Sequence, residues 1–581
     1  IVIEINEVEN MEAVKHDISK RFNLADSRPI HIALYSGKEH NYMLFEVHHI
    51  IADGASASVL MNEIDRAYNG EDIEPEDYTF YDVTAEELRL RAGSEEYEAA
   101  RLWYEQNFNI GDVDTQIIAD RNEKEAAVVH AEYNLNIDKE NIRHLIESTE
   151  VKAGTLFTSA FALLMSKFTG DEQVLFSTIW HGRSDKRMAR TMGMFVKTLP
   201  VHYAFHRGMT LAELFAHGDK IIKGARKHSV FSYADANASL GIKSNYLFVY
   251  QGYLFNNITI GGYPVTMEDL EESATTEPLS IQIYQERDGG YRAVVEYFSH
   301  LYSEALVAQL IESFEAILNS MHDGTQSIDE LSYITPRQET LLDSFNATER
   351  EYDASQTVLS YFAKHVASNP EHLAVVYKDK KYTYKEVDEL SNKIAHRINN
   401  YGLGRGDVVA VLIPRSEWMM IASLGVLKAG CGYEPLDPSY PNERLQFMTK
   451  DAGVRMIIAD KDLLSAIELD IENVLFTDDI ITLDEPTTTP NIEVRPDDLF
   501  IMLYTSGSTG VPKGCMLEHR NILSFELSHT QICGINSDSR VTAYASYGFD
   551  ASMMETYSAV VSGATLHIIA EEIRLDFVAL N

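Results

Sequence analysis

The sequence predicts an α/β protein in two parts, because strand-like apolar runs alternate with segments of helical periodicity through most of its 581 residues. Hydrophobic residues make up 45% of the chain, which is enough for packed cores and too much for a disordered chain. Residues 334–356 are polar and irregular, and they predict a linker. We therefore expect one domain over residues 1–333, in two lobes of about 1–125 and 126–333, and a second domain over residues 357–581.

Charge and cysteine content exclude several classes of protein. The chain carries 89 acidic and 49 basic residues, a formal net charge of −40, whereas a nucleic-acid-binding surface needs clustered Lys and Arg. We interpret the excess as a solvated acidic surface. The three cysteines form no C-x-x-C pair, which predicts a reducing cytoplasm and no zinc framework.

No apolar run reaches the length of a membrane span, so we expect no membrane partner. Because the chain starts without Met or a signal-peptide pattern, we interpret it as a piece of a longer protein.

Two adjacent histidines, His48 and His49, stand where a predicted strand ends. Residues 42–48 are rich in apolar and aromatic side chains and predict a strand, and residues 56–68 have an apolar face at helical spacing. The histidines therefore lie at a strand-to-helix turn. Because successive side chains of a strand point to opposite faces, we expect only one of the two imidazoles to face a given cavity.

Asp53 and Gly54 complete this turn and suggest its chemistry. A neutral imidazole can take up a proton near physiological pH, since its ordinary pKa is about 6.5. The first N–H groups of the following helix favour negative charge. A base beside such a turn suits acyl transfer. Two alternatives stay open: a buried structural histidine pair, and, more weakly, a metal site, since no further ligand follows at suitable spacing.

The full pattern H-H-x-x-x-D-G-x-S resembles the signature of condensation domains of nonribosomal peptide synthetases, which share the fold of chloramphenicol acetyltransferase. The resemblance implies that His49 lines a tunnel where two carrier-bound substrates meet, with His48 mainly packing. It implies a mainly structural Asp53, for which Arg183 is a candidate ion-pair partner. We expect His49 to orient or deprotonate the attacking amine and the N–H groups near Gly54 to stabilise the oxyanion.

Other condensation motifs match less completely. Residues 193–200 resemble a G-x-F-V-N-T motif but have Lys197 where Asn is usual, and residues 228–233 match a later motif poorly. The basic motif that normally comes first is absent, so we expect a truncated first lobe. A cyclisation domain would have Asp at the position of His48, and an epimerisation domain would usually have Trp at the position of Ala57. Both are disfavoured, and a degenerate docking scaffold stays open.

The second half centres on an eleven-residue string, residues 504–514, that follows an apolar strand at residues 499–503. Small hydroxyl and glycine residues let backbone N–H groups approach phosphate oxygens. The string is not a Walker A loop, because Pro512 and Gly514 stand where that motif needs Gly and Ser or Thr. A flexible surface loop is the alternative. The expected phosphate-binding residues are Thr505, Ser506, Gly507, Ser508, Thr509, Gly510 and Lys513.

This string resembles the phosphate loop of the adenylate-forming superfamily. Three further segments, residues 382–387, 427–438 and 549–552, resemble the adenylation domains of peptide synthetases within it. The resemblance implies ATP and Mg²⁺ as cofactors and Asp550 as the residue that holds the α-ammonium of the substrate amino acid. A loop-capping role is the alternative for Asp550. The later adenylation motifs are absent, so we expect only the N-terminal part of this domain.

Together the two resemblances imply a condensation domain followed by the front of an adenylation domain, in a nonribosomal peptide synthetase. The implied partners are upstream and downstream carrier domains that bear 4′-phosphopantetheine, together with an amino acid. The implied reaction is aminolysis of a carrier-bound thioester, coupled to amino-acid activation. An acyl-CoA ligase is the rival interpretation of the second half.

Overall fold

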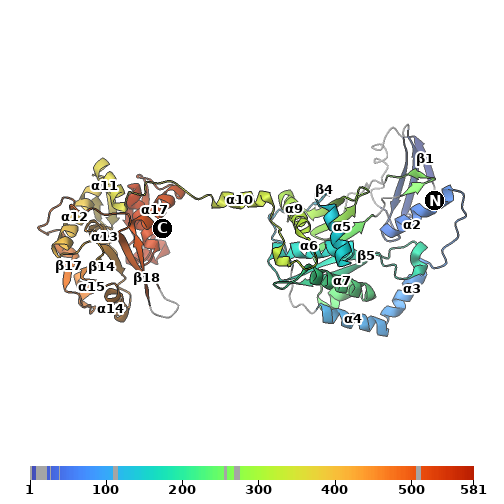
Figure 1. The fold of residues 1–581 in the computed structure, drawn as a ribbon, viewed down its shortest axis with the longest axis horizontal. Coiled ribbons are helices and arrows are strands. Elements are labelled where there is room, and N and C mark those ends of the chain that lie inside the picture. The colour runs from blue at the N-terminus through green and yellow to red at the C-terminus, as the bar shows by residue number, and fades with distance from the viewer. Residues whose placement is uncertain are drawn as a thin grey trace. The chain divides into compact units, whose positions relative to one another are not determined.

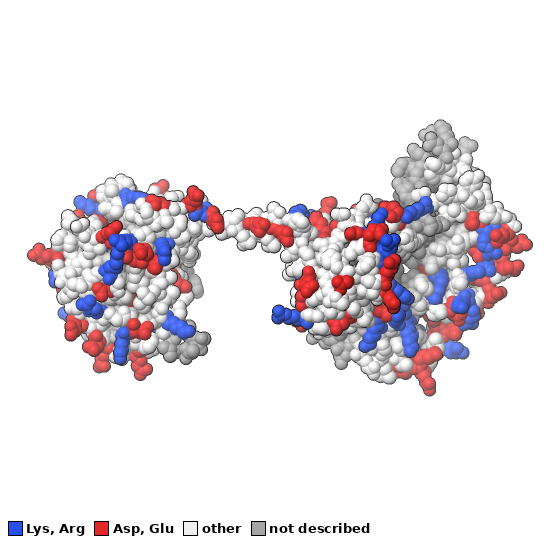
Figure 2. Space-filling model, viewed as in Figure 1, with Lys and Arg blue, Asp and Glu red and all other residues white. Residues whose placement is uncertain are grey.

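The computed structural model describes residues 3–7, 22–25, 28–37, 40–108, 115–253, 258–266, 275–505 and 512–580. The chain divides into a first unit, residues 1–347, and a second unit, residues 348–581 (Figure 1). In Figure 2, acidic and basic side chains are interspersed over the visible face of each unit. Among the described helices, none combines the length and the apolar character that a membrane crossing requires.

A small sheet and, among the described residues, three helices precede the main sheet of the first unit. In the small sheet, β1 (Ile3–Glu7) runs parallel to β2 (Ile30–Ser36), which pairs antiparallel with β3 (Asn41–Val47). Leu44 of β3 is buried, as the apolar strand pattern predicts. The predicted helix after the histidine pair is confirmed. The three helices are α2 (Gly54–Tyr68), α3 (Phe80–Arg91) and α4 (Glu95–Asn107).

The main sheet of the first unit has six strands of mixed direction. In spatial order they are β4 (Val128–Leu135), β11 (Tyr291–Phe298), β10 (Leu279–Gln285), β7 (Tyr246–Gly252), β5 (Gln173–Trp180) and β6 (Lys197–Ala204). Its helices are α5 (Lys139–Thr149), α6 (Ala153–Thr169), α7 (Leu211–Lys227), α8 (Tyr233–Leu240) and α9 (Glu304–Ser320). Short elements complete it: η1 (Lys186–Arg190), β8 (Thr259–Ile260), β9 (Tyr263–Pro264) and η2 (Ile328–Glu330).

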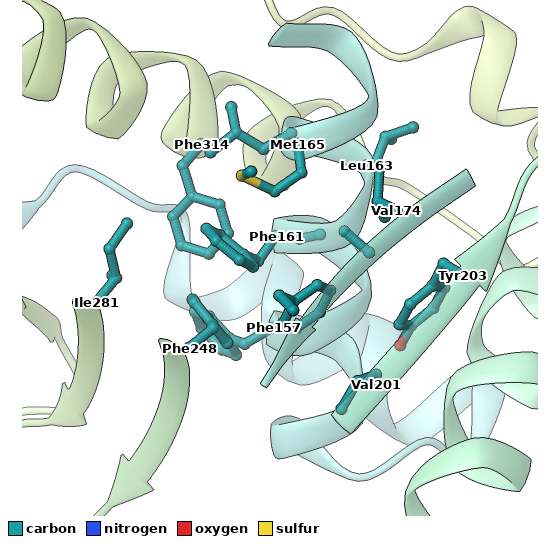
Figure 3. Close-up of a cluster of buried hydrophobic side chains, with 14 of the residues drawn as sticks. Phe157, Phe161, Leu163, Met165, Val174, Val201, Tyr203, Phe248, Ile281 and Phe314 are labelled. Carbon is teal, nitrogen blue, oxygen red and sulfur yellow. The ribbon is translucent and has the colours of Figure 1, made fainter. Parts of the chain in front are cut away.

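The core of the first unit is built around α6, whose central residues are buried on all sides. Phe161 of α6 stacks on Phe248 of β7 with ring centroids 4.6 Å apart, and Phe314 of α9 closes the same cluster (Figure 3). Gly170 ends the helix in the left-handed conformation that glycine tolerates. This core makes the main sheet a rigid base for the loops at its strand ends.

The predicted linker is not irregular throughout. Residues 336–346 form helix α10 (Pro336–Asn346), in which Thr335 and Gln338 make a capping box and Pro336 occupies the first turn. The prediction of irregular structure was wrong there, because Thr335-Pro336 was interpreted as a loop signal, whereas it also starts helices. No residue of α10 is buried, so tertiary packing contributes little to this helix.

The second unit contains two sheets. Five strands of the larger one are parallel, as predicted from the alternating pattern, and its edge strand β19 is antiparallel. The larger sheet has the order β17 (Asn473–Phe476), β16 (Met456–Ala459), β14 (Val408–Leu412), β15 (Gly432–Leu436), β18 (Leu499–Thr505) and β19 (Lys513–Glu518). The smaller sheet has the order β13 (Lys380–Thr383), β12 (Leu373–Tyr377), β21 (Thr565–Ile568) and β20 (Arg540–Ala543).

Helix α13 (Trp418–Lys428) is the centre of this unit, since all of its residues are buried and side chains from both sheets belong to the same core cluster. The other helices are α11 (Val358–Ser368), α12 (Tyr384–Asn400), α14 (Asn442–Asp451), α15 (Lys461–Ser465), α16 (Thr477–Ile480), α17 (His519–Ile532), α18 (Ala551–Ser562), α19 (Glu571–Arg574) and α20 (Phe577–Leu580).

Candidate functional site

The histidine pair lies in the turn between β3 and α2. Strand β3 ends at Val47, so the alternation argument for the two imidazoles was wrong: His48 and His49 follow the strand instead of continuing it. His48 is half-buried and His49 is exposed. The ring of Phe22 lies edge-on to that of His48, with centroids 6.2 Å apart.

The two imidazoles differ in their hydrogen bonds. Nδ1 of His48 accepts the N–H of Ile50 at 3.0 Å, so in the neutral ring the hydrogen is on Nε2. Nδ1 of His49 lies 2.9 Å from the carbonyl oxygen of Ala52, which can only accept, so here the hydrogen is on Nδ1. His49 therefore presents a lone pair at Nε2, whereas His48 presents an N–H. Of the two rings, only that of His49 therefore has an outer nitrogen, Nε2, without a hydrogen, and this nitrogen can accept a proton.

Asp53 is the N-cap of α2, and its carboxylate is fully buried. One oxygen accepts the N–H of Ser56 at 2.8 Å, and the other accepts Nη1 of Arg183 at 2.9 Å and the N–H of Phe195 at 3.0 Å. Burial raises the pKa of Asp53, but the hydrogen bonds from Arg183, Phe195 and Ser56 outweigh it and hold the pKa below the ordinary value. The predicted ion pair with Arg183 is confirmed.

This network ties the histidine turn to the segment between β5 and β6. Arg183 also donates to the Ser56 hydroxyl at 2.9 Å, and that hydroxyl accepts the N–H of Gly193 at 3.1 Å. A Cβ at Gly193 would lie 2.3 Å from the ring of Phe80, and one at Gly182 would lie 1.8 Å from the carbonyl oxygen of Phe195. Both glycines are therefore required by close packing around the Asp53–Arg183 pair.

Gly54 and the next residue supply the N–H groups that were expected to stabilise an oxyanion. Gly54 is the first residue of α2 and is exposed. The Asp53 side chain occupies the N–H of Ser56, whereas the N–H groups of Gly54 and Ala55 have no acceptor in the described part of the chain. The free donors of this helix end are thus those two groups.

Lys197, the departure from the expected Asn, is the first residue of β6 and forms an ion pair with Glu87 of α3. The poorly matching segment 228–233 ends α7 and starts α8, and His228 there stacks on Trp103 with ring centroids 5.1 Å apart. Both departures are accommodated by specific contacts within the first unit.

In the second unit, the predicted phosphate loop joins β18 to β19. Thr505 and Lys513 face each other across the antiparallel pair and are both exposed. The other predicted members, Ser506, Gly507, Ser508, Thr509 and Gly510, lie outside the described residues. The loop emerges at the carboxyl end of β18, the edge of a parallel sheet where α/β proteins bind ligands.

Asp550 directly precedes α18 and is exposed. Its side chain makes no capping hydrogen bond to the helix, so the alternative of a capping role is wrong. In the described part of the chain its carboxylate has no hydrogen-bond partner. Three residues earlier, Tyr547 donates to the carbonyl oxygen of Met419 at 3.1 Å, and the hydroxyl of Ser546 donates to Asp437, which follows β15. These contacts bring the Asp550 segment to the same edge of the larger sheet as β15, the neighbour of β18.

The sequence reasoning missed several functional or unusual groups. Arg415, after β14, donates to the carbonyls of Ala543 and Ala545, and Glu555, on α18, accepts from backbone N–H groups of the same stretch, which leads to Asp550. Glu434, on β15, is fully buried with both carboxyl oxygens unpartnered. Its burial, together with the charge of Asp451, raises its pKa to about 8. The signals for Glu434 were a charged residue inside an apolar strand run and its departure from the adenylation motif that residues 427–438 resemble.

Comparison with known proteins assigns the first unit. The family model for the condensation domain matches residues 2–342. The chain belongs to the condensation-domain family. A second family model, for AMP-binding enzymes, matches residues 362–580. The order of these two domains identifies the chain as a condensation–adenylation segment of the nonribosomal peptide synthetase type.

The relatives are nonribosomal peptide synthetases. Tyrocidine synthase 2 from Brevibacillus parabrevis is 26% identical over 98% of this chain, which covers 16% of that protein. Surfactin synthase subunit 1 from Bacillus subtilis is 26% identical over 99% of the chain and is likewise covered to 16%. The chain thus spans about a sixth of the length of these relatives.

Solved structures support the fold of the condensation–adenylation segment. The four-domain nonribosomal peptide synthetase holo-AB3403, bound to AMP and glycine, aligns over 100% of this chain and 46% of its own, with a TM-score of 0.78 and 18% identity. The synthetase FmoA3 aligns over 98% of this chain and 62% of its own, with a TM-score of 0.74 and 17% identity. At these identities the likeness establishes the fold alone.

Proposed function

We propose that the condensation domain forms a peptide bond by aminolysis of a carrier-bound acyl thioester, and that the adenylation part activates an amino acid with ATP. The observation that carries the first half is the contact between His49 Nδ1 and the carbonyl oxygen of Ala52 at 2.9 Å, which assigns the ring hydrogen to Nδ1. This Nδ1 donates to the Ala52 carbonyl, which leaves the Nε2 lone pair of an exposed ring available in the turn that precedes α2.

In the proposed reaction, the α-amine of the acceptor attacks the thioester carbonyl carbon of the donor. His49 orients this amine through Nε2 or accepts the proton that the amine loses as the C–N bond forms. In this proposal the N–H groups of Gly54 and Ala55, which have no acceptor among the described residues, stabilise the negative charge on the carbonyl oxygen. The C–S bond then breaks, and the leaving thiolate of the donor carrier takes up the proton.

Asp53 and His48 have structural roles in this proposal, because they hold the turn in position. The carboxylate of Asp53 has both oxygens engaged within the protein, which leaves neither of them for a substrate. With Arg183 it fixes the start of α2 relative to the main sheet. His48 packs against Phe22 and holds the N–H of Ile50, so we assign it a packing role.

For the adenylation part, the AMP-binding match implies the use of ATP. We propose that the loop from Thr505 to Lys513 binds its phosphates and that Asp550, exposed and unpartnered, binds the substrate α-ammonium. Among the described residues, no group of three His, Cys, Asp or Glu side chains could hold a metal ion. Magnesium, which the resemblance implies, would neutralise the charge of the ATP phosphates.

We further propose the setting in which the segment works. It acts within a longer synthetase, with upstream and downstream carrier domains bearing 4′-phosphopantetheine, and with residues 334–356 connecting domains at 1–333 and 357–581. The three cysteines are free thiols, which supports a cytoplasmic location.

The test is dipeptide formation by the synthetase that carries this segment, on loaded donor and acceptor carriers. We expect His49→Ala to reduce dipeptide yield by roughly 100-fold or more, while loading of the acceptor amino acid continues. His144→Ala, at an exposed histidine of α5, is the matched control. Normal dipeptide yield from His49→Ala would favour the scaffold alternative.

A further inference from the structure

Arg415 lies in the loop after β14 of the larger sheet, and only 8% of its side chain is exposed. Its guanidinium donates to three backbone carbonyls. Two of them, at Ala543 and Ala545, lie at the carboxyl end of β20, and the third, at Ile569, follows β21 and is 2.8 Å from Nε. Arg415 thus connects the larger sheet of the second unit to the smaller one.

Glu555 holds the same backbone from the other side. Its carboxylate accepts the N–H of Tyr544 at 2.8 Å and that of Ala545 at 2.9 Å. The peptide groups from 543 to 545 are therefore fixed through both their carbonyl and their N–H groups. The opposite charges of Arg415 and Glu555 match these two sets of partners.

The fixed stretch continues to Asp550. The hydroxyl of Ser546 donates to Asp437, which in turn accepts the N–H of Ser439 at 2.8 Å. The carbonyl oxygen of Phe549 accepts the hydroxyl of Ser552 at 2.7 Å. Asp550 comes next, with an exposed carboxylate that nothing in the described part of the chain occupies. A rigid segment thus ends in a free anion.

We propose that Arg415 is a positioning residue for amino-acid recognition. By fixing the segment from 543 to 545, it sets the place of Asp550 relative to the sheet that carries the phosphate loop, because β14, β15 and β18 are neighbouring strands. This inference rests on the proposed role of Asp550. In-line attack of a substrate carboxylate on the α-phosphate depends on such relative placement, and a small displacement is costly.

The chemistry requires arginine. A guanidinium offers five donors in a fixed plane and can serve three carbonyls at once, whereas a lysine ammonium is a point charge on a flexible stem. Arg415→Lys keeps the charge and removes the three-way contact. Arg405→Lys is the matched control, because Arg405 holds the buried carboxylate of Asp498 in the same unit instead.

The experiment is amino-acid-dependent ATP–pyrophosphate exchange by the synthetase that carries this segment. The probes are the best substrate from a screen of the proteinogenic L-amino acids and its des-amino carboxylic acid. We expect Arg415→Lys to raise KM for the amino acid about tenfold and to change KM for ATP less than about threefold. We also expect its preference for the amino acid over the des-amino analogue to fall about tenfold, in the direction of Asp550→Asn.

The outcomes separate the two claims. If Asp550→Asn leaves the preference unchanged, the proposed role of Asp550 fails, and the inference fails with it. If Asp550→Asn lowers the preference and Arg415→Lys behaves like Arg405→Lys, the inference on Arg415 alone is overturned. If Arg415→Lys does not fold, Ser546→Ala decides, because it removes only the hydroxyl contact with Asp437. We expect it to lower the preference roughly threefold, and an unchanged preference would overturn the proposal.

Discussion

Asp53 in the first unit and Glu434 in the second are both buried carboxyl groups, yet the protein holds them in opposite protonation states. Asp53 accepts hydrogen bonds from Arg183 and from two backbone N–H groups, and its pKa is lowered. Among the described residues Glu434 has no partner for either oxygen, and its pKa is raised to about 8. At neutral pH the first is an anion and the second is mostly a neutral acid.

The difference shows that burial alone does not determine the charge of a carboxyl group. Burial raises the pKa in both places, and only the donors around Asp53 reverse the effect. Around Glu434 the neighbouring charge is the carboxylate of Asp451, which accepts the hydroxyl of Tyr504 at 2.7 Å and adds repulsion. One carboxyl group therefore stabilises the turn that carries His49, while the other is a cost within its sheet.

The largest expected effect is at Asp53. Asp53→Ala leaves Arg183 buried without its partner, and removing one member of a buried pair typically costs about 3–5 kcal/mol. We expect thermal unfolding of the condensation domain to shift down clearly more than in His49→Ala, which changes only an exposed ring. Equal melting curves for the two variants would point to a direct chemical role of Asp53.

Glu434 should give a smaller effect, and one with the opposite dependence on pH. Its pKa is near 4.5 when unfolded and about 8 when folded, so between these values only the folded protein keeps the proton. From this group, the free energy of unfolding falls by about 1.4 kcal/mol per pH unit as pH rises through that window, and then levels off. The contribution of Asp53, whose pKa is lowered, is instead present above pH about 4 and lost as pH falls.

Glu434→Gln isolates this dependence, because the amide imitates the protonated acid at every pH. We expect the variant to equal the wild type at about pH 4, below the unfolded pKa, and to be the more stable one at pH 8 and above. Native-state hydrogen exchange of the amides in β14 and β15 would measure the difference in the free energy of unfolding between the two proteins. Glu443→Gln, at an exposed position of α14, is the control. A pH-independent difference for Glu434→Gln would show that the carboxyl group finds a partner.

Local patterns in the sequence predicted most elements and the motif residues. The strand before His48, the helix after Asp53 and the parallel sheet of the second unit follow from periodicity and turn residues, which act over short distances. The ion pair of Asp53 with Arg183 joins residues 130 positions apart, and it was predictable only because a family resemblance pointed to both.

The features that the sequence did not predict depend on tertiary contacts between distant residues, which no local sequence pattern specifies. The tautomers of His48 and His49 depend on which backbone groups the turn presents to each ring. The role of Arg415 depends on carbonyls more than 120 residues away. The start of α10 was missed because Thr335-Pro336 is equally typical of a loop and of a helix N-terminus.

Lys197 should give the smallest effect, because its side chain, unlike those of Asp53 and Glu434, is partly exposed. Its pair with Glu87 is partly exposed, with side-chain accessibilities of 22% and 42%. Pairs of this kind contribute about 0–1 kcal/mol, since water screens the charges. We expect Lys197→Asn, which restores the usual residue of the motif, to change the free energy of unfolding by less than about 1 kcal/mol. Dipeptide formation should stay within about threefold of the wild type.

Glu87→Gln removes the same pair from the other side and is the control. A gain of more than about tenfold in dipeptide formation by Lys197→Asn alone would mean that Lys197 impairs the condensation site, in the direction of a degenerate domain.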